Sequence, residues 1–276
     1  MCDGKKLVAL QEPHTKLLAC RRDKINCESV STTSNGGRAM EQGPLTVDVI
    51  DAIYTTGAQR RLKPDPIPES VIWAVLDAAI HGPSGGNSQR WAWVVITDPD
   101  TKRLVGDWYL DAWNSLGLGR RAKVQKVIHR LTGPAHGDAG TTEHHKGDCN
   151  YRSGEYLAHH IAEAPVWIFA VVNGIHGTPS VVDGADIFGA VQNLMLAARK
   201  YGLGTTLTML HRKQEAKLDA LLGLPRDAQA LALIPLGYPM SGEFYVTRRQ
   251  PVDAVTYWER WGEQRARGNG GPSATN

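Results

Sequence analysis

The pattern of apolar and polar positions predicts alternating helices and strands from Thr46 onward. Residues 68–80 place apolar side chains on one face and begin with a proline, which is favourable in the first turn of a helix. Residues 91–97 are mostly aromatic or β-branched and carry no charge, which is typical of a buried strand. The other predicted elements are a short helix near 47–54, helices at about 99–116, 153–163, 184–201 and 212–222, and strands at 166–172, 205–210 and 231–236.

Residues 185–202 form the most apolar of these predicted helices, with hydrophobic side chains nearly all round. Such a helix is expected at the centre of a domain or in an extensive interface, and core packing alone would account for each of its residues. Residues 117–150 differ, because they are rich in Gly, His and Lys and show weak periodicity. We interpret them as a partly helical excursion or a lid over a site.

The two ends of the chain differ in composition from its middle. Residues 1–44 are rich in Lys, Arg, Ser, Thr, Asn and Gly, with a single short apolar patch, and we predict a disordered N-terminal extension. Met40 opens a segment that looks like an ordinary protein start. With residues 266–276 as a flexible tail, the sequence predicts one folded domain over 45–265.

Composition and charge argue against several classes of protein. The 276 residues are 42% hydrophobic and 21% charged, which is ordinary for a globular protein with a sizeable core. A net charge of +3 with scattered basic residues gives no basis for nucleic-acid binding. The sequence shows no apolar run of transmembrane length, no secretory signal and no disulfide framework among its four cysteines, so we expect a cytoplasmic protein without a membrane partner.

A metal centre is disfavoured by the sequence. Glu143, His144, His145 and Cys149 could supply ligands, yet adjacent histidines point apart on most backbones and no second cluster completes a tetrahedral site. The nucleophile motif GxSxG and the dinucleotide motif GxGxxG are absent. The glycines of 116–121 lack the preceding strand and the following acidic residue that a nucleotide site requires.

Three segments together offer what a phosphate-bearing cofactor needs, namely guanidinium groups, backbone amides freed by glycine, and side-chain amides or hydroxyls. Arg60 and Arg61 precede a Pro-Asp-Pro, the turn-forming loop 83–89 comes directly before a strand, and Arg248 and Arg249 precede a proline. Taken singly, these segments would be interpreted as solvated turn arginines, a plain Gly-rich connection and a surface pair.

In their order and spacing these segments resemble the FMN-dependent nitroreductase family. The matching stretches are RRLKPDPIP at 60–68, PSGGNSQRW at 83–91, GLGTT at 202–206, LGYP at 236–239 and RRQP at 248–251. The likeness extends over about 46–262. It implies an α+β fold with a mixed, largely antiparallel sheet flanked by helices, FMN as cofactor, NAD(P)H as electron donor, and a homodimer with FMN at the interface.

The resemblance also assigns site residues position by position. Arg60 matches the residue that reaches the flavin N1/O2 edge, where negative charge collects on reduction, and with Asn87 it is predicted to be catalytic. Arg249 would bind the phosphate, with Arg248 as a second contact. The backbone at Thr208 and Met209 would lie near flavin N5. The predicted cofactor-binding residues are Arg60, Arg61, Pro83, Ser84, Gly85, Asn87, Gln89, Thr208, Met209, Arg248 and Arg249, with no metal ligand.

Some positions depart from the family pattern. Gly57 and Ala58 stand where the family often has Arg and Ser, which removes two phosphate or ribityl contacts. Arg90 replaces a usual proline and is expected to add a cation near the loop. Met209 and Leu210 replace a glycine pair that is frequent near flavin N5.

The resemblance implies two-electron reduction of nitroaromatics, quinones or related electrophiles by NAD(P)H through FMN. The sequence shows no separate nucleotide-binding domain, so the nicotinamide and the acceptor would use one pocket in turn, which predicts ping-pong kinetics. Two alternatives stay open. One is the reductive dehalogenase or flavin-destructase branch of the same superfamily, and the other is a flavin-binding protein without turnover.

Overall fold

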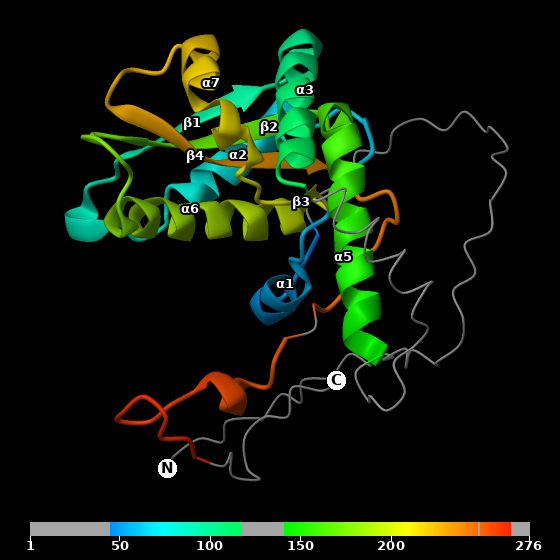
Figure 1. The fold of residues 1–276 in the computed structure, drawn as a ribbon, viewed down its shortest axis with the longest axis vertical. Helices are drawn as coiled ribbons and strands as arrows, with labels where there is room; N and C mark the ends of the chain where they lie inside the picture. Colours follow the sequence, from blue (N-terminus) through cyan, green and yellow to red (C-terminus); the bar gives the residue numbers. More distant parts are fainter. Residues whose placement is uncertain (1–44, 118–140, 248, 266–276) are drawn as a thin grey trace, which may run out of the picture. The chain divides into compact units, whose positions relative to one another are not determined.

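The computed structural model describes residues 45–117, 141–247 and 249–265, with the side chains of 141–150 left out. The predicted N-terminal extension, residues 118–140 of the predicted lid, Arg248 and the predicted C-terminal tail lie outside this description. Within the described part, helices pack on both faces of one small sheet (Figure 1).

The sheet is antiparallel throughout its described strands. These are β1 (Trp91–Ile96), β2 (Val166–Asn173), β3 (Gly204–Thr205) and β4 (Ala228–Gly237), in the order β1-β2-β4-β3. The pairing of β1 with β2 aligns Trp91 with Val172, and a shift in the β2–β4 register occurs between Ala170 and Val171. The predicted α+β fold with a largely antiparallel sheet is confirmed.

Alternation along β2 explains how both faces of the sheet become buried. The helices are α1 (Val49–Thr55), α2 (Glu69–Ala79), α3 (Pro99–Ser115), α5 (Thr141–His160), α6 (Val181–Lys200) and α7 (Glu215–Leu222), with 3-10 turns at Gly85–Asn87, Ile161–Glu163, Leu210–Gln214 and Val252–Val255. Ile168 and Ala170 face a core shared with α2 and α6. Trp167 and Phe169 face a second core shared with α3, α5 and α7, because successive strand residues point to opposite faces.

The strand predicted at 205–210 is wrong beyond its start. Gly204 and Thr205 pair with β4, Thr208 makes a separate bridge to Leu233, and a 3-10 turn begins at Leu210. The apolar and β-branched composition of this run suits a strand, but the chain leaves the sheet edge after two residues. Local composition could not show where the pairing stops.

Two helices begin earlier than the sequence pattern predicts. α5 begins at Thr141 rather than near 153. The sequence pattern does not predict the first half of this helix, because that half is polar and has no apolar periodicity. α6 begins at Val181 rather than 184, because Ser180 and Asp183 form a capping box. In this box Ser180 Oγ accepts from Asp183 N, and Asp183 Oδ2 accepts from Ser180 N, which satisfies two otherwise free amides.

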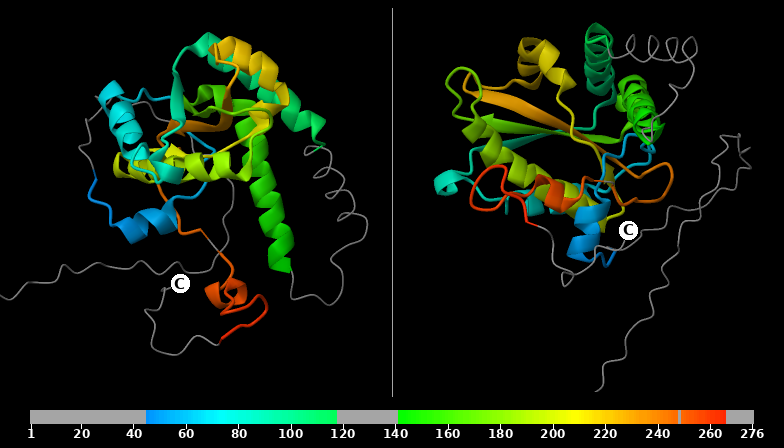
Figure 2. Two further views of the ribbon diagram at one scale, coloured as in Figure 1. Left: turned by 90° about the vertical axis from the view of Figure 1, so that its left-hand side faces the viewer. Right: turned by 60° about the horizontal axis from the view of Figure 1, so that its bottom comes forward.

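α6 lies across one face of the sheet beside α2, as predicted for the most apolar helix (Figures 1 and 2). Among the described helices it alone is long and apolar enough to cross a membrane, although no such run was expected. It nevertheless buries one stripe against the sheet, which is typical of a core helix. The buried residues of this stripe are Asp183, Asp186, Ile187, Ala190, Val191, Leu194 and Ala198.

Candidate functional site

A small cavity lies between the segment after α1, the helices α3 and α5, and the chain that follows β3. Its volume is about 260 Å³. Arg60 is the charged residue in a lining that is otherwise apolar or hydroxyl-bearing, so the cavity suits an apolar ring with an electron-rich edge. The lining residues are Arg60, Tyr109, Trp113, Gly154, Leu157, Thr206, Leu207, Thr208 and Leu210.

The backbone at Thr208 is fixed from two sides. Thr208 N donates to Leu233 O and Leu233 N donates to Thr208 O, both at 2.9 Å. The Oγ1 atom of Thr208 is also 2.7 Å from the hydroxyl of Tyr109 on α3. Burial raises the pKa of Tyr109, against the opposing effects of Thr208 and Arg60, so this phenol is neutral at neutral pH. The segment matched to the neighbourhood of flavin N5 is therefore rigid.

The neighbouring residues Arg60 and Arg61 have different surroundings. Gln59 N donates to Thr205 O at 2.8 Å, which holds this segment beside β3 and leaves Arg60 in the lining of the cavity. The guanidinium of Arg61 lies 3.9 Å from the ring centre of Tyr156 on α5, which is a cation–π contact. Of the two predicted cofactor ligands, Arg60 reaches the cavity, whereas Arg61 stacks on a helix.

The segment that precedes Arg249 runs beside the chain leading to Arg60. Thr247 N donates to Tyr54 O at 3.2 Å. A Cβ atom at Gly57 would lie only 2.6 Å from Thr247 Cγ2. Gly57, which departs from the family pattern, therefore makes room for this C-terminal segment. Arg249 comes two residues after Thr247 and is exposed.

The predicted cofactor loop has an unusual backbone. Gly86, Asn87 and Gln89 have φ values of 58°, 55° and 48°. Such left-handed conformations are uncommon for residues with side chains and persist where the surroundings hold them. Ser84 Oγ accepts from Gln89 N at 3.1 Å, so this hydroxyl is used inside the loop. Asn87 and Gln89 lie on the surface.

The loop and Arg60 lie beside opposite ends of α6. Gly85 N donates to Asp186 near the start of the helix, whereas Thr55 accepts from Arg199 near its end. These two helix positions are about 20 Å apart at a rise of 1.5 Å per residue. Figure 1 shows the cyan turn of the loop at one end of α6 and β3 at the other. A single chain therefore does not bring Asn87 together with Arg60, although the two were predicted to serve one site.

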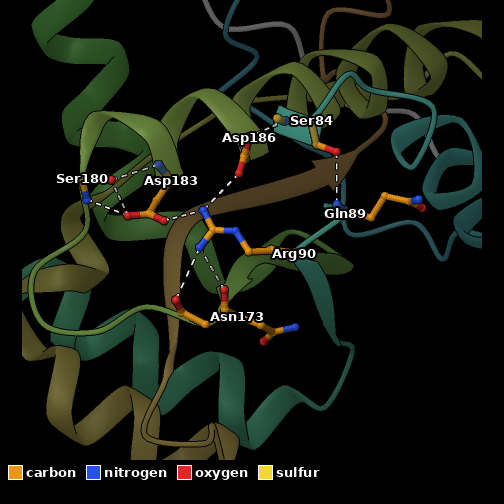
Figure 3. A network of polar contacts seen from close by, with 9 residues as sticks. Ser84, Gln89, Arg90, Asn173, Ser180, Asp183 and Asp186 are labelled. Atoms are coloured by element: carbon orange, nitrogen blue, oxygen red, sulfur yellow. Dashed lines mark hydrogen bonds and ion pairs between the residues drawn. The ribbon is translucent and has the colours of Figure 1, made fainter. Parts of the chain in front are cut away.

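Arg90 does not add a free cation to the loop. Its Nη2 lies 2.7 Å from Asp183 Oδ1 and 3.0 Å from Asp186 Oδ2 (Figure 3). Hydrogen bonds from Ser180, followed by that from Arg90, lower the pKa of Asp183 to about 2. The hydrogen bond from Gly85 N, followed by that from Arg90, lowers the pKa of Asp186. Both carboxylates are charged at neutral pH and compensate the guanidinium.

Sequence reasoning missed several residues that shape these places. Tyr109 and Trp113 line the cavity, and a Cβ atom at Gly154 would lie 2.8 Å from the Trp113 ring, so this helical glycine permits a close approach. Asp186 holds the loop. No local signal marks these residues, because their partners lie far away in the sequence.

No three His, Cys, Asp or Glu side chains gather to hold a metal ion within the described residues. Among the described histidines, His159 is exposed, and His160 Nδ1 lies 2.7 Å from Glu163 Oε1. The side chains of the remaining candidates in 143–149 lie outside the description, so the expected lack of a metal site stays a prediction.

Comparison with known proteins identifies the family. The profile described as "Nitroreductase family" matches residues 55–238. An NADH dehydrogenase of Thermus thermophilus is 31% identical over 219 residues, which cover 79% of this chain and 100% of the relative. Iodotyrosine deiodinase 1 of Rattus norvegicus is 27% identical over 188 residues, which cover 66% of this chain and 59% of the deiodinase.

A solved structure shows the same fold. The FMN-dependent nitroreductase NfnB from Mycobacterium smegmatis, in complex with NADPH, aligns with a TM-score of 0.53 at 19% identity and covers 77% of this chain and 100% of that chain. At this identity the likeness concerns the fold alone. The family profile, however, matches more than half of the sequence, and the Thermus relative is matched over its full length. The chain therefore belongs to the nitroreductase family and is an oxidoreductase of that family.

Proposed function

We propose that this protein is an FMN-dependent enzyme that takes electrons from NAD(P)H and passes them to a nitroaromatic, quinone or related electrophile. The observation that carries the proposal is the cavity that Arg60 lines together with Thr208, whose backbone is fixed by two bonds to Leu233. An electron-accepting ring needs a positive charge where negative charge collects, and a rigid neighbour for its reacting atom. These residues offer both.

The residues of the described chain fit a flavin nucleotide. Arg60 holds a positive charge in the cavity, and Tyr109 and Trp113 provide aromatic walls. Arg249 follows the segment that runs beside this stretch, where its guanidinium suits a phosphate. Bound FMN would supply the exchange of hydride between donor and acceptor. Thr208 would keep the backbone beside the ring in place through its bonds to Leu233 and Tyr109.

The size of the cavity supports a site shared between two protomers. About 260 Å³ lies below the roughly 300–1,000 Å³ of sites that enclose a small organic ligand. The loop 83–89, which is the other predicted part of the site, lies beside the far end of α6. We therefore place the loop of one protomer beside the cavity of the other in a homodimer. Two-fold symmetry would then form two equal sites.

The exposed apolar surface of the described residues also supports a dimer. Side chains of this kind occur on α1 and along the C-terminal segment, and Trp261 is 89% exposed. Large apolar surfaces that stay exposed in a single chain mark interaction sites. The exposed apolar residues of these two segments are Val49, Ile50, Ile53, Tyr54, Tyr245, Val246, Val252, Val255, Trp258 and Trp261.

Rapid mixing under anaerobic conditions tests the reaction. We expect NADH or NADPH to bleach the absorption of bound flavin, and a nitroaromatic to restore it. Faster restoration of the flavin absorption by an iodo-aromatic, with release of iodide, would favour the dehalogenase alternative. The similarity to iodotyrosine deiodinase supports this alternative. Bound flavin that neither nicotinamide bleaches would favour a binding protein without turnover.

A further inference from the structure

Both ends of the predicted cofactor loop are fastened to one carboxylate. Gly85 N donates to Asp186 Oδ1 at 2.8 Å, and Arg90 Nη2 donates to Asp186 Oδ2 at 3.0 Å (Figure 3). The turn between these contacts holds the exposed side chains of Asn87 and Gln89. Asp186 therefore closes the turn at its base while its own carboxylate belongs to the buried side of α6.

The backbone of this turn needs such support. Gly86, Asn87 and Gln89 are all left-handed. Glycine and asparagine tolerate this conformation, whereas the side chain of Gln89 disfavours it. Within the turn, Asn87 N donates to Ser84 O at 3.0 Å, and Gln89 N to Ser84 Oγ at 3.1 Å. A strained backbone persists only where the surroundings fix it, and the anchor to α6 comes from outside the turn.

Arg90 connects the anchor to the rigid part of the domain. Its Nη2 also donates to Asp183 Oδ1 at 2.7 Å, and its Nη1 lies 3.5 and 3.4 Å from the carbonyl oxygens of Asn173 and Gly174, where β2 ends. The side chains of Asp183 and Asp186 are 11% and 9% exposed. Charge-assisted hydrogen bonds that are mostly shielded from water are among the strong ones.

We propose that Asp186 and Arg90 are positioning residues that hold the loop 83–89 in the conformation that binds flavin. The inference rests on the proposed function and extends it to residues that do not touch the cofactor cavity of their own chain. Because the loop is shaped before the ligand arrives, the free energy of ordering it is not lost on binding. Weakening the anchor therefore lowers flavin affinity while the fold remains.

The two carboxylates provide a matched pair of variants. Asp186→Ala removes an ion pair with Arg90 and the bond to Gly85 N. Asp183→Ala also removes an ion pair with Arg90, together with the carboxylate's bonds to Ser180 in the capping box of α6. Only the first variant frees the loop directly. We would measure the FMN dissociation constant by fluorescence quenching, and hydrogen exchange of the 84–90 amides in the flavin-free protein. Thermal unfolding of each flavin-free variant reports its effect on the fold.

We expect Asp186→Ala to raise the FMN dissociation constant about tenfold and to speed hydrogen exchange of the loop amides. Asp183→Ala should change the dissociation constant and the exchange rate by less than about twofold each. Asp186→Asn, which keeps an oxygen for Gly85 N, should recover part of the affinity. Equal weakening by both alanine variants, in proportion to their lost thermal stability, would overturn the proposal. So would wild-type affinity and exchange in Asp186→Ala. Wild-type protein that binds no FMN would instead refute the proposed function, and the exchange data would still test the anchor.

Discussion

A methyl group added at Gly82 should separate the loop from α6. The Cβ atom of an alanine there would lie 2.6 Å from Ala190 N and 2.7 Å from Ala190 Cα. Both are backbone atoms of the central helix, so the loop rather than the helix would have to move, by about 1 Å in a close-packed interior. The substitution therefore tests the close approach on which the position of the loop depends.

Two opposing effects determine how much Gly82→Ala changes the free energy of unfolding. Overpacking costs about 1–3 kcal/mol, whereas the lower entropy of the unfolded chain returns about 0.4–1 kcal/mol. The steric cost wins, with a net loss of about 1–2 kcal/mol and a fall in Tm of about 2–8 °C for a domain of this size. We also expect weaker FMN binding, because the displaced loop no longer lies where Asp186 holds it.

Gly184→Ala is the matched control, because Gly184 lies on α6, the helix that Gly82 approaches. Its Cβ atom would lie 3.5 Å from the Phe188 ring, which is an ordinary contact, and alanine is favoured over glycine in a helix by about 0.5–1 kcal/mol. Thermal unfolding of the flavin-free proteins should therefore show opposite shifts for the two variants. A Gly82→Ala protein that is as stable as the wild type and binds FMN equally well would refute the close approach.

Further predictions concern a buried histidine, the phosphate site and the reaction. Burial lowers the pKa of His211 to about 4, below its ordinary 6.5, so the unfolded chain takes up the extra proton between these values. The stability linked to His211 is thus complete above about pH 6.5 and is lost toward pH 4, by up to roughly 3 kcal/mol, and His211→Gln should flatten this slope in urea unfolding. An unchanged slope would show that other groups cause it. Arg249→Glu should weaken FMN binding at least about tenfold in a fluorescence titration, because it replaces a phosphate ligand by a like charge, and unchanged affinity would remove Arg249 from the site. Initial rates against both substrates should give parallel double-reciprocal lines, and intersecting lines would contradict alternate use of one pocket.

The fold was largely predictable where local periodicity decides the structure. The helix predicted at 68–80 and the strand predicted at 91–97 lie within one residue of α2 and β1 at each end. Each has a clear apolar pattern, because the helix turns one face toward the core and the strand packs against core side chains on both of its faces. The run 205–210 has the composition of a strand, yet pairing with β4 ends after two residues. That end depends on a distant partner, which local composition does not encode.

In the candidate site, too, local motifs mark some residues, whereas others depend on partners far away in the sequence. Arg60 could be selected from its motif, and the structure places it in the cavity. Tyr109 could not, because its partner Thr208 is 99 residues away, and Asp186 lies 101 residues from Gly85. Arg90 was recognisable as a cation but not as a partner of buried carboxylates. Motifs mark the residues that face a ligand, whereas the residues that position them become visible only through folding.

The most direct test of the account is the visible absorption spectrum of the purified protein after gel filtration with excess FMN, with the molar mass measured in the same run. The account predicts flavin absorption that elutes with a dimer at about one FMN per chain, because each site needs the loop of one protomer and the cavity of the other. A colourless protein would contradict the flavin enzyme, and full flavin retention by a monomer would contradict the shared site.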